Sequence, residues 1–193
     1  MAGRPRQFDI DAAIDAVLPL FVERGYEGAS FGDLIKAIGI NPPSFYAAFG
    51  NKEGLFRQVL GRYIAGARTA IREAMAEPTA REAVRHLLIG YVNAVTANET
   101  GRGCLLVQGA LATTNSSVHL RDYLSEQREA TTTAIALRLL QAAQSNDRTF
   151  PGEPYAVARL ISMVITGIAT QAASGVTKRE LLEAVEVLIA QFE

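Results

Sequence analysis

The feature that most constrains this chain is the repeated pairing of a helix-start signal with apolar residues at helical spacing. After Asp9, apolar side chains recur three or four residues apart as far as Phe21, which is the period of an amphipathic helix. Later apolar stretches follow Ser, Thr or Asn residues whose side-chain oxygens can accept from the first N–H groups of a helix. No long stretch alternates apolar and polar residues as a strand does. The sequence therefore predicts an all-α fold of about nine helices.

Helix boundaries follow from these caps and from glycine and proline stops. Capping-box patterns stand at 30–33, 79–82 and 177–180, and Gly25, Gly28, Gly39 and Gly50 mark helix ends. The expected helices cover about 9–25, 30–39, 41–50, 51–76, 79–97, 104–111, 116–145, 154–173 and 177–193.

The composition indicates a protein with a packed core and without intrachain disulfide bonds or a membrane segment. Hydrophobic residues make up 49% of 193 residues, enough for a packed core. The single cysteine, Cys104, excludes an intrachain disulfide framework. We find neither an apolar run of membrane-spanning length nor the apolar run of a signal peptide, so we expect a cytoplasmic protein with no membrane partner.

Residues 30–50 have the outline of a helix-turn-helix. Two short helices meet at Gly39-Ile40, a spacing typical of a positioning helix followed by a recognition helix for the major groove. An ordinary helical hairpin has the same outline, so this pattern alone leaves both interpretations open.

A longer pattern resembles a known family. From Arg4 to about Tyr63 the chain is similar to the DNA-binding domain of TetR-family regulators, in the stretches FDIDAAIDAVLPLFVERGYEG, SFGDLIKAIG and INPPSFYAAFGNKEGLF. The resemblance implies a helix-turn-helix domain at 1–54 and a helical ligand-binding and dimerisation domain at 55–193. It also implies a repressor that binds a palindromic double-stranded operator and is released by a small-molecule inducer. An activator of the same family and a helical interaction protein without DNA are the alternatives.

The same resemblance assigns DNA contacts. It places Ser30, Tyr46 and Lys52 at phosphates, which position a protein without reading sequence. The positions expected to face the groove are Gly32, Asn41, Pro42, Pro43, Ser44 and Ala47. Few of these can hydrogen-bond to base edges, and the two prolines offer apolar surface suited to thymine methyl groups.

A basic arm precedes the first helix. Gly3-Arg4-Pro5-Arg6 resembles the core of an AT-hook, and we expect Arg4 and Arg6 to enter a narrow minor groove. The overall charge of −1 argues against DNA binding, as do the five basic and seven acidic residues of segment 1–56. Only the local placement of these charges can resolve this, because salt screens charges beyond about 8 Å.

The last two helices indicate a homodimer. Residues 153–193 carry apolar side chains on more than one helix face, and such faces must be buried. The resemblance implies that they form a four-helix bundle between two subunits; one large intrachain core is the alternative.

The inducer is expected inside the C-terminal domain, where apolar linings are combined with a few polar anchors. The candidate ligand-binding residues are Tyr91, Asn93, Gln108, Thr113, Tyr123, Thr166 and Gln171. No other cofactor is expected. The fourth helix alone runs from one domain into the other, so it is the expected lever.

Metal sensing and catalysis are the weaker interpretations. The segment 102–107 and the start of the chain faintly resemble a copper-responsive branch of the family, but Cys104 has no second cysteine, and His86 and His119 lack ligand spacing. We expect no metal site and a structural Cys104. No phosphate-binding loop, HExxH or nucleophile elbow occurs, so we expect no enzyme and no catalytic residue.

Overall fold

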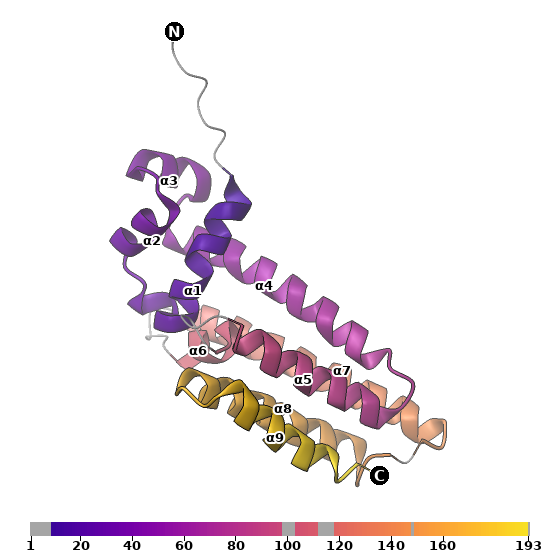
Figure 1. The fold of residues 1–193 in the computed structure, drawn as a ribbon. Helices are drawn as coiled ribbons and strands as arrows, with labels where there is room; N and C mark the ends of the chain where they lie inside the picture. The colour runs from indigo at the N-terminus through magenta and orange to yellow at the C-terminus, as the bar shows by residue number, and fades with distance from the viewer. Residues whose placement is uncertain (1–8, 98–102, 112–117, 148, 193) are drawn as a thin grey trace.

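The computed structural model describes residues 9–97, 103–111, 118–147 and 149–192, and these are entirely helical apart from turns and loops (Figure 1). The described residues form nine helices, as predicted. These are α1 (Ile10–Gly28), α2 (Phe31–Ile38), α3 (Pro42–Phe49), α4 (Lys52–Met75), α5 (Ala80–Val95), α6 (Leu105–Leu111), α7 (Val118–Gln144), α8 (Pro154–Ala173) and α9 (Lys178–Ile189).

The predicted caps explain most of these boundaries. Thr79 and Thr177 each form a complete capping box with the glutamate three residues later. Asn41 and Asn51 accept from the backbone N–H groups of Ser44 and Gly54, respectively. Local sequence therefore sets where the helices begin, before any packing is considered.

Two boundaries differ in detail from the prediction. Helix α1 is assigned through Gly28, but its backbone breaks at Gly25, where φ is 67° and ψ is −178°. A side chain at Gly25 would be strained in this left-handed region, so the predicted stop is real but is followed by one more turn. The capping box predicted at Ser30 is only half formed, as described below.

An aromatic core holds the N-terminal end together. Helices α1, α2 and α3 gather around the first turns of α4, and Phe21, Phe45 and Phe56 are fully buried there. The rings of Phe21 and Phe56 meet edge to face with their centroids 4.9 Å apart, a favoured geometry for aromatic pairs. This packing fixes α3 at the outer end of the molecule (Figure 1).

Helix α4 leads from this end into the rest of the chain (Figure 1). Its 24 residues extend about 36 Å at the usual helical rise. The predicted domain boundary at 54–55 falls inside α4, so the same rigid element belongs to both predicted domains. The domain division itself stays a prediction.

Helices α5 to α9 form the C-terminal layers. Helix α5 packs against α4 on one side and against α8 and α9 on the other, and α7 lies along α8. Several large apolar side chains of α8 and α9 remain exposed: Tyr155, Leu160, Met163 and Val187. Among the described helices, α8 is long and apolar enough to cross a membrane by length and composition, and about a third of it is buried within this chain.

Candidate functional site

Ser30 and Asp33 organise the start of α2. The Ser30 hydroxyl accepts from the Asp33 backbone N–H at 3.1 Å and donates to the Asp33 carboxylate at 2.7 Å. Arg24 also donates to this carboxylate, at 3.0 Å. The Ser30 hydrogen bond, assisted by Arg24, holds the pKa of Asp33 below its usual value.

The predicted capping box at Ser30 was therefore only partly right. The Asp33 carboxylate binds the cap hydroxyl and Arg24, and no bond from the Ser30 backbone N–H to it is formed. Aspartate is one methylene shorter than the glutamate of a full capping box, which explains the missing half. The prediction that Ser30 caps α2 is confirmed; its phosphate contact stays a prediction.

Helix α3 presents the surface expected to face a DNA groove. Gly39 closes the turn before it with φ of 74°, a conformation that suits glycine. Phe45 and Phe49 are buried, with ring centroids 5.3 Å apart, so the opposite face of α3 must point outward. The predicted groove-facing residues are all exposed: Gly32, Asn41, Pro42, Pro43, Ser44 and Ala47.

Tyr46 lies at the edge of this surface. Its side chain is 54% exposed, and its ring stacks on Phe31 with centroids 5.5 Å apart and planes inclined by 23°. The stacking holds the ring in place at the surface while leaving its outer edge accessible, which is the placement a phosphate contact needs.

Lys52, predicted to contact a phosphate, is half-buried at the start of α4. Its ammonium donates to the Glu27 carbonyl oxygen at 3.3 Å and lies 4.8 Å from the centre of the Tyr26 ring. Burial lowers the pKa of Lys52. A phosphate contact by Lys52 would therefore have to compete with these two partners. Arg4 and Arg6 lie outside the described residues.

Gly54 brings α3 and α4 into close contact. A Cβ atom at this position would lie 2.1 Å from the Phe49 carbonyl oxygen, a backbone atom that no side-chain movement can relieve. Only glycine fits there, so the corner between α3 and α4 depends on this residue.

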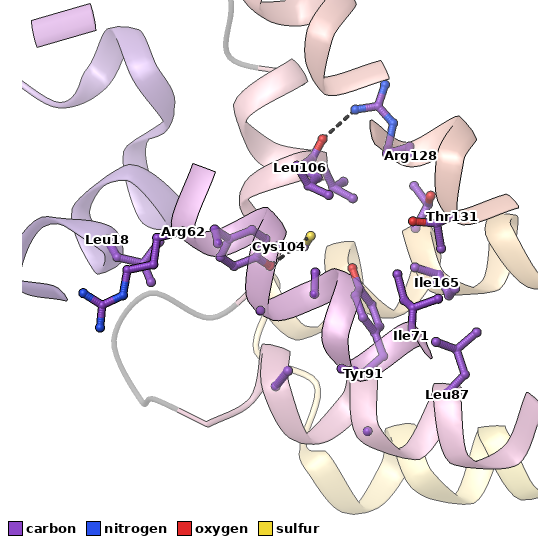
Figure 2. Close-up of a pocket in the computed structure, with 18 of the residues that line it drawn as sticks. Leu18, Arg62, Ile71, Leu87, Tyr91, Cys104, Leu106, Arg128, Thr131 and Ile165 are labelled. Atoms are coloured by element: carbon purple, nitrogen blue, oxygen red, sulfur yellow. Dashed lines mark hydrogen bonds between the residues drawn. The ribbon is translucent and has the colours of Figure 1, made fainter. Parts of the chain in front are cut away.

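A cavity of about 450 Å³ lies between α4, α5, α6, α7 and α8 and reaches α1 (Figure 2). Its volume is in the range of small-molecule sites. Most of the lining is apolar, including Val59, Ile71, Leu87, Leu106 and Ile165.

Two tyrosines and the cysteine form a polar group in the wall. The Tyr63 hydroxyl donates to Cys104 Sγ at 3.2 Å. The buried Tyr91 hydroxyl has no hydrogen-bond partner among the described residues. Burial first, and the neighbouring Cys104 second, raise the pKa of both tyrosines well above the usual value, so both hydroxyls keep their protons at physiological pH. Tyr91 is thus a donor facing the cavity (Figure 2).

The cavity touches the DNA-binding end through α1. Ile14, Asp15 and Leu18 of α1 and Arg62 of α4 belong to its lining. Arg62 donates to the Asp11 carboxylate at 3.0 Å and to the Asp15 carboxylate at 3.1 Å. These ion pairs join α1 to α4 at the edge of the cavity.

Comparison with known proteins decides the family. Residues 13–59 match the family described as bacterial regulatory proteins, tetR family. A solved structure of the TetR-family regulator CifR, a cysteine mutant bound to a 26-base-pair operator DNA, has 37% sequence identity and a TM-score of 0.89; the match covers 98% of this chain and all of that one. The chain belongs to the TetR family. It is therefore a DNA-binding transcriptional regulator with the helix-turn-helix fold that its sequence predicted, in a family of regulators rather than enzymes.

Curated TetR-family relatives extend over most of the chain. The transcriptional repressor ComR of Escherichia coli K12 is 29% identical over 183 residues, which cover 94% of this chain and 87% of ComR. The repressor BdcR of the same organism is 28% identical over 179 residues, covering 90% and 83%. Both similarities therefore extend well beyond residues 13–59 into the C-terminal helices.

The structure brings only some of the predicted ligand residues to the cavity. Tyr91 and Thr166 line it. Asn93, Tyr123 and Gln171 are exposed and lie outside its lining. Gln108 lies against Gly103 and is also outside the lining. Thr113 lies outside the described residues.

Sequence reasoning missed Tyr63, Arg62 and Arg128, which line the cavity. Tyr63 and Arg128 could have been found from position, because each follows the apolar spacing of its helix. No group of three or more potential metal ligands occurs in the described residues, and Cys104 is buried beside the tyrosines. The role of Cys104 stays a prediction.

Proposed function

We propose that this TetR-family protein is a repressor that binds a palindromic operator as a homodimer and is released when a small molecule fills the cavity. The observation that carries this proposal is the lining of the cavity, which combines C-terminal residues with Ile14, Asp15 and Leu18 of the DNA-binding end. A molecule bound there contacts both domains at once, so its binding energy can depend on their relative position.

The outward face of α3 supports the DNA part of the proposal. Its exposed residues are small or rigid, and Pro42 and Pro43 begin the helix without N–H groups. The N–H of Ser44 is already bound by Asn41. In this proposal α3 enters the major groove through side-chain and apolar contacts, Ser30, Tyr46 and Lys52 contact phosphates, and the N-terminal arm enters the minor groove.

The exposed apolar residues of α8 and α9 support the homodimer. Met163 and Val187 are 65% and 70% exposed, and Leu160 and Tyr155 accompany them. The solved structure of the 37% identical CifR bound to operator DNA makes a second protein copy a better cover for this face than lipid. Two recognition helices in one dimer reach half-sites about 34–36 Å apart.

Release requires a path from the cavity to α3. Helix α4 carries the cavity residues Val59 and Tyr63 and begins directly after α3. The Arg62 ion pairs join α4 to α1, and His119 of α7 bonds to Glu53 in the first turn of α4 at 3.1 Å. A ligand that moves α4 moves α3 with it, and couplings of this kind are typically worth about 1–3 kcal/mol.

Tyr46→Phe tests the DNA contact. The variant removes one hydroxyl and keeps the ring on Phe31, so we expect operator affinity to fall about tenfold for every operator sequence, because a phosphate contact does not read bases. Fluorescence anisotropy with DNA from upstream of the protein's own gene measures the loss, and Tyr123→Phe on α7 is the matched control. Equal affinity of Tyr46→Phe and the unchanged protein would contradict the phosphate role.

Charge on the exposed α8–α9 face tests the homodimer. We expect Met163→Glu combined with Val187→Glu to yield folded monomers in sedimentation velocity and to abolish operator binding, since buried like charges would oppose association. A dimer of unchanged stability would contradict the interface. A reporter gene behind the operator then distinguishes repression from activation.

A further inference from the structure

The buried face of α7 contains one charged residue. Leu124, Thr132, Ile135 and Leu139 are buried and recur at helical spacing, which places them on one helix face. Arg128 stands four residues from both Leu124 and Thr132, so it lies on the same face, and it is half-buried in the cavity wall (Figure 2). A charge on a face otherwise used for packing needs an explanation, because burying a guanidinium is costly unless it has a partner.

The partners of Arg128 within the chain do not neutralise its charge. It donates from Nη1 to the Leu106 carbonyl oxygen, which occupies one of its five N–H donors. Its neighbour Glu129 is bound instead by Arg159, at 2.7 and 2.8 Å. No ion pair joins Arg128 to a carboxylate in the part of the chain that the structure describes.

Hydroxyl groups gather beside Arg128 in the same cavity. Thr131 of α7 and Ser162 and Thr166 of α8 belong to the lining. The Ser162 and Thr132 hydroxyl oxygens lie 2.9 Å apart, and Thr132 also reaches the Arg128 carbonyl oxygen at 3.3 Å. Thr131 and Thr166 donate to carbonyl oxygens of their own helices. The carboxylates of the lining, Asp15 and Glu73, come from α1 and α4, and Arg62 of the lining is paired with Asp15. Arg128 is therefore the positive charge of this wall, and most of the remaining lining is apolar.

We propose that the ligand of this cavity is an organic monoanion whose carboxylate is held by Arg128, in the wall that also carries the Ser162 hydroxyl. This inference rests on the proposed function, in which the cavity is the inducer site. A guanidinium matches a carboxylate with two parallel hydrogen bonds. One positive charge balances one negative charge, so a carboxylate fits better than a phosphate dianion.

The apolar part of the ligand would lie against Ile71, Leu87 and Ile165, with the Tyr91 hydroxyl available to a further oxygen. A cavity of about 450 Å³ accommodates roughly 10–15 non-hydrogen atoms, if each takes up to about the 30 Å³ that a water molecule occupies. Medium-chain fatty acids and short arylalkanoic acids have this size and polarity.

Matched pairs of acids and amides test the proposal on the full-length protein. The probes are octanoate with octanamide and 4-phenylbutanoate with 4-phenylbutanamide, measured by calorimetry and by ligand-induced thermal stabilisation. We expect at least one acid to bind ten times more tightly than its amide. Arg128→Gln is expected to remove this preference, Arg128→Lys to retain part of it, and Arg68→Gln to leave it unchanged, because Arg68 bonds to Gln127 outside the cavity.

The result that overturns the proposal is an amide that binds as well as its acid, an acid affinity unchanged by Arg128→Gln, or no binding of either acid at millimolar concentration. A dimer that dissociates in Arg128→Gln while acid affinity stays the same would also overturn it, by assigning Arg128 to a carboxylate of a second copy. Operator binding without ligand is measured in parallel for all variants. If the unaltered protein does not bind operator DNA, the proposed function is refuted. If a neutral compound releases the operator and no acid does, only the proposal of an anionic ligand is refuted.

Discussion

The two ends of this molecule are packed in opposite ways. Around α3, rings fill the interior: the centroid of the Phe45 ring lies 4.9 Å from that of Phe31 and 5.3 Å from that of Phe49. Helices α4 to α8, together with α1, instead border a cavity of about 450 Å³, and the Tyr91 hydroxyl in its wall has no hydrogen-bond partner among the described residues. Close packing gives a single rigid shape, whereas a void lets walls adapt. The end formed by α1, α2 and α3, here called the reading end, therefore keeps its shape. The end that surrounds the cavity can change its shape when a ligand binds.

The largest expected effect comes from matched leucines, one at each end. Leu34→Ala in α2 removes a fully buried side chain from the filled core, and we expect a loss near the upper end of about 2–5 kcal/mol in unfolding free energy. Leu87→Ala in the cavity wall should cost near the lower end, because Leu87 already borders empty space. Chemical denaturation measures both losses. Equal losses would break the comparison between the two ends.

Removal of residues 1–7 tests how far the reading end depends on an element beyond its filled core. We expect operator affinity to fall at least tenfold, or about 1.4 kcal/mol, and its salt dependence to flatten, because Arg4 and Arg6 no longer displace counterions. Anisotropy titrations at several salt concentrations measure both quantities, and unfolding curves should coincide with those of the intact chain. Binding that keeps both its affinity and its salt slope would rule out a minor-groove arm.

Arg62→Gln sharpens the comparison at the junction of the two ends. Both ion pairs of Arg62 are solvent-exposed, so their loss should lower stability by less than about 1 kcal/mol. The coupling between ligand binding and operator binding should fall by more than the stability does, because α1 is then held less firmly to α4. The measurement is the ratio of operator affinities with and without ligand. A ratio equal to that of the unchanged protein would show that the ion pairs do not carry the signal.

The smallest expected effect is a loss of unfolding free energy at alkaline pH, and it comes from Tyr91 in the wall of the cavity. Burial raises the pKa of Tyr91, so the folded chain keeps this proton above pH 10 while the unfolded chain releases it. Stability is therefore unaffected below pH 10 and falls as the pH rises beyond it. Tyr91→Phe should make that fall shallower in denaturation series from pH 8 to 11. An identical slope for variant and unchanged protein would argue against Tyr91 as a contributor.

Sequence alone predicted the helices and the reading face because both depend on local signals. Asn41, Thr79 and Thr177 cap helices through contacts three residues away, and a local pattern records such contacts fully. The buried spacing of Phe45 and Phe49 likewise determines which side of α3 is exposed. The sequence did not predict the detailed hydrogen bonding at Asp33, whose carboxylate accepts from Arg24 of the previous helix.

The cavity was predicted less well because its walls come from six helices and its shape depends on their packing. Polarity within an apolar helix was used as the guide, and it selected Asn93 and Gln171, which are exposed. A better guide was available in Arg128, a charged residue on the same face of α7 as the apolar Leu124, Ile135 and Leu139. The conflict between residue type and helix face, rather than polarity itself, indicated the site.

Gly54 has a consequence for how operators and this regulator can change together. Because a methyl group at this position would collide with the Phe49 carbonyl oxygen, the angle at which α3 leaves α4 cannot be adjusted there by small steps. If the distance between the two half-sites of an operator changes, the subunit interface has to change with it. If the base sequence of the operator changes, substitutions on the outer face of α3 can restore binding. The two kinds of evolutionary change are thereby assigned to separate parts of the chain.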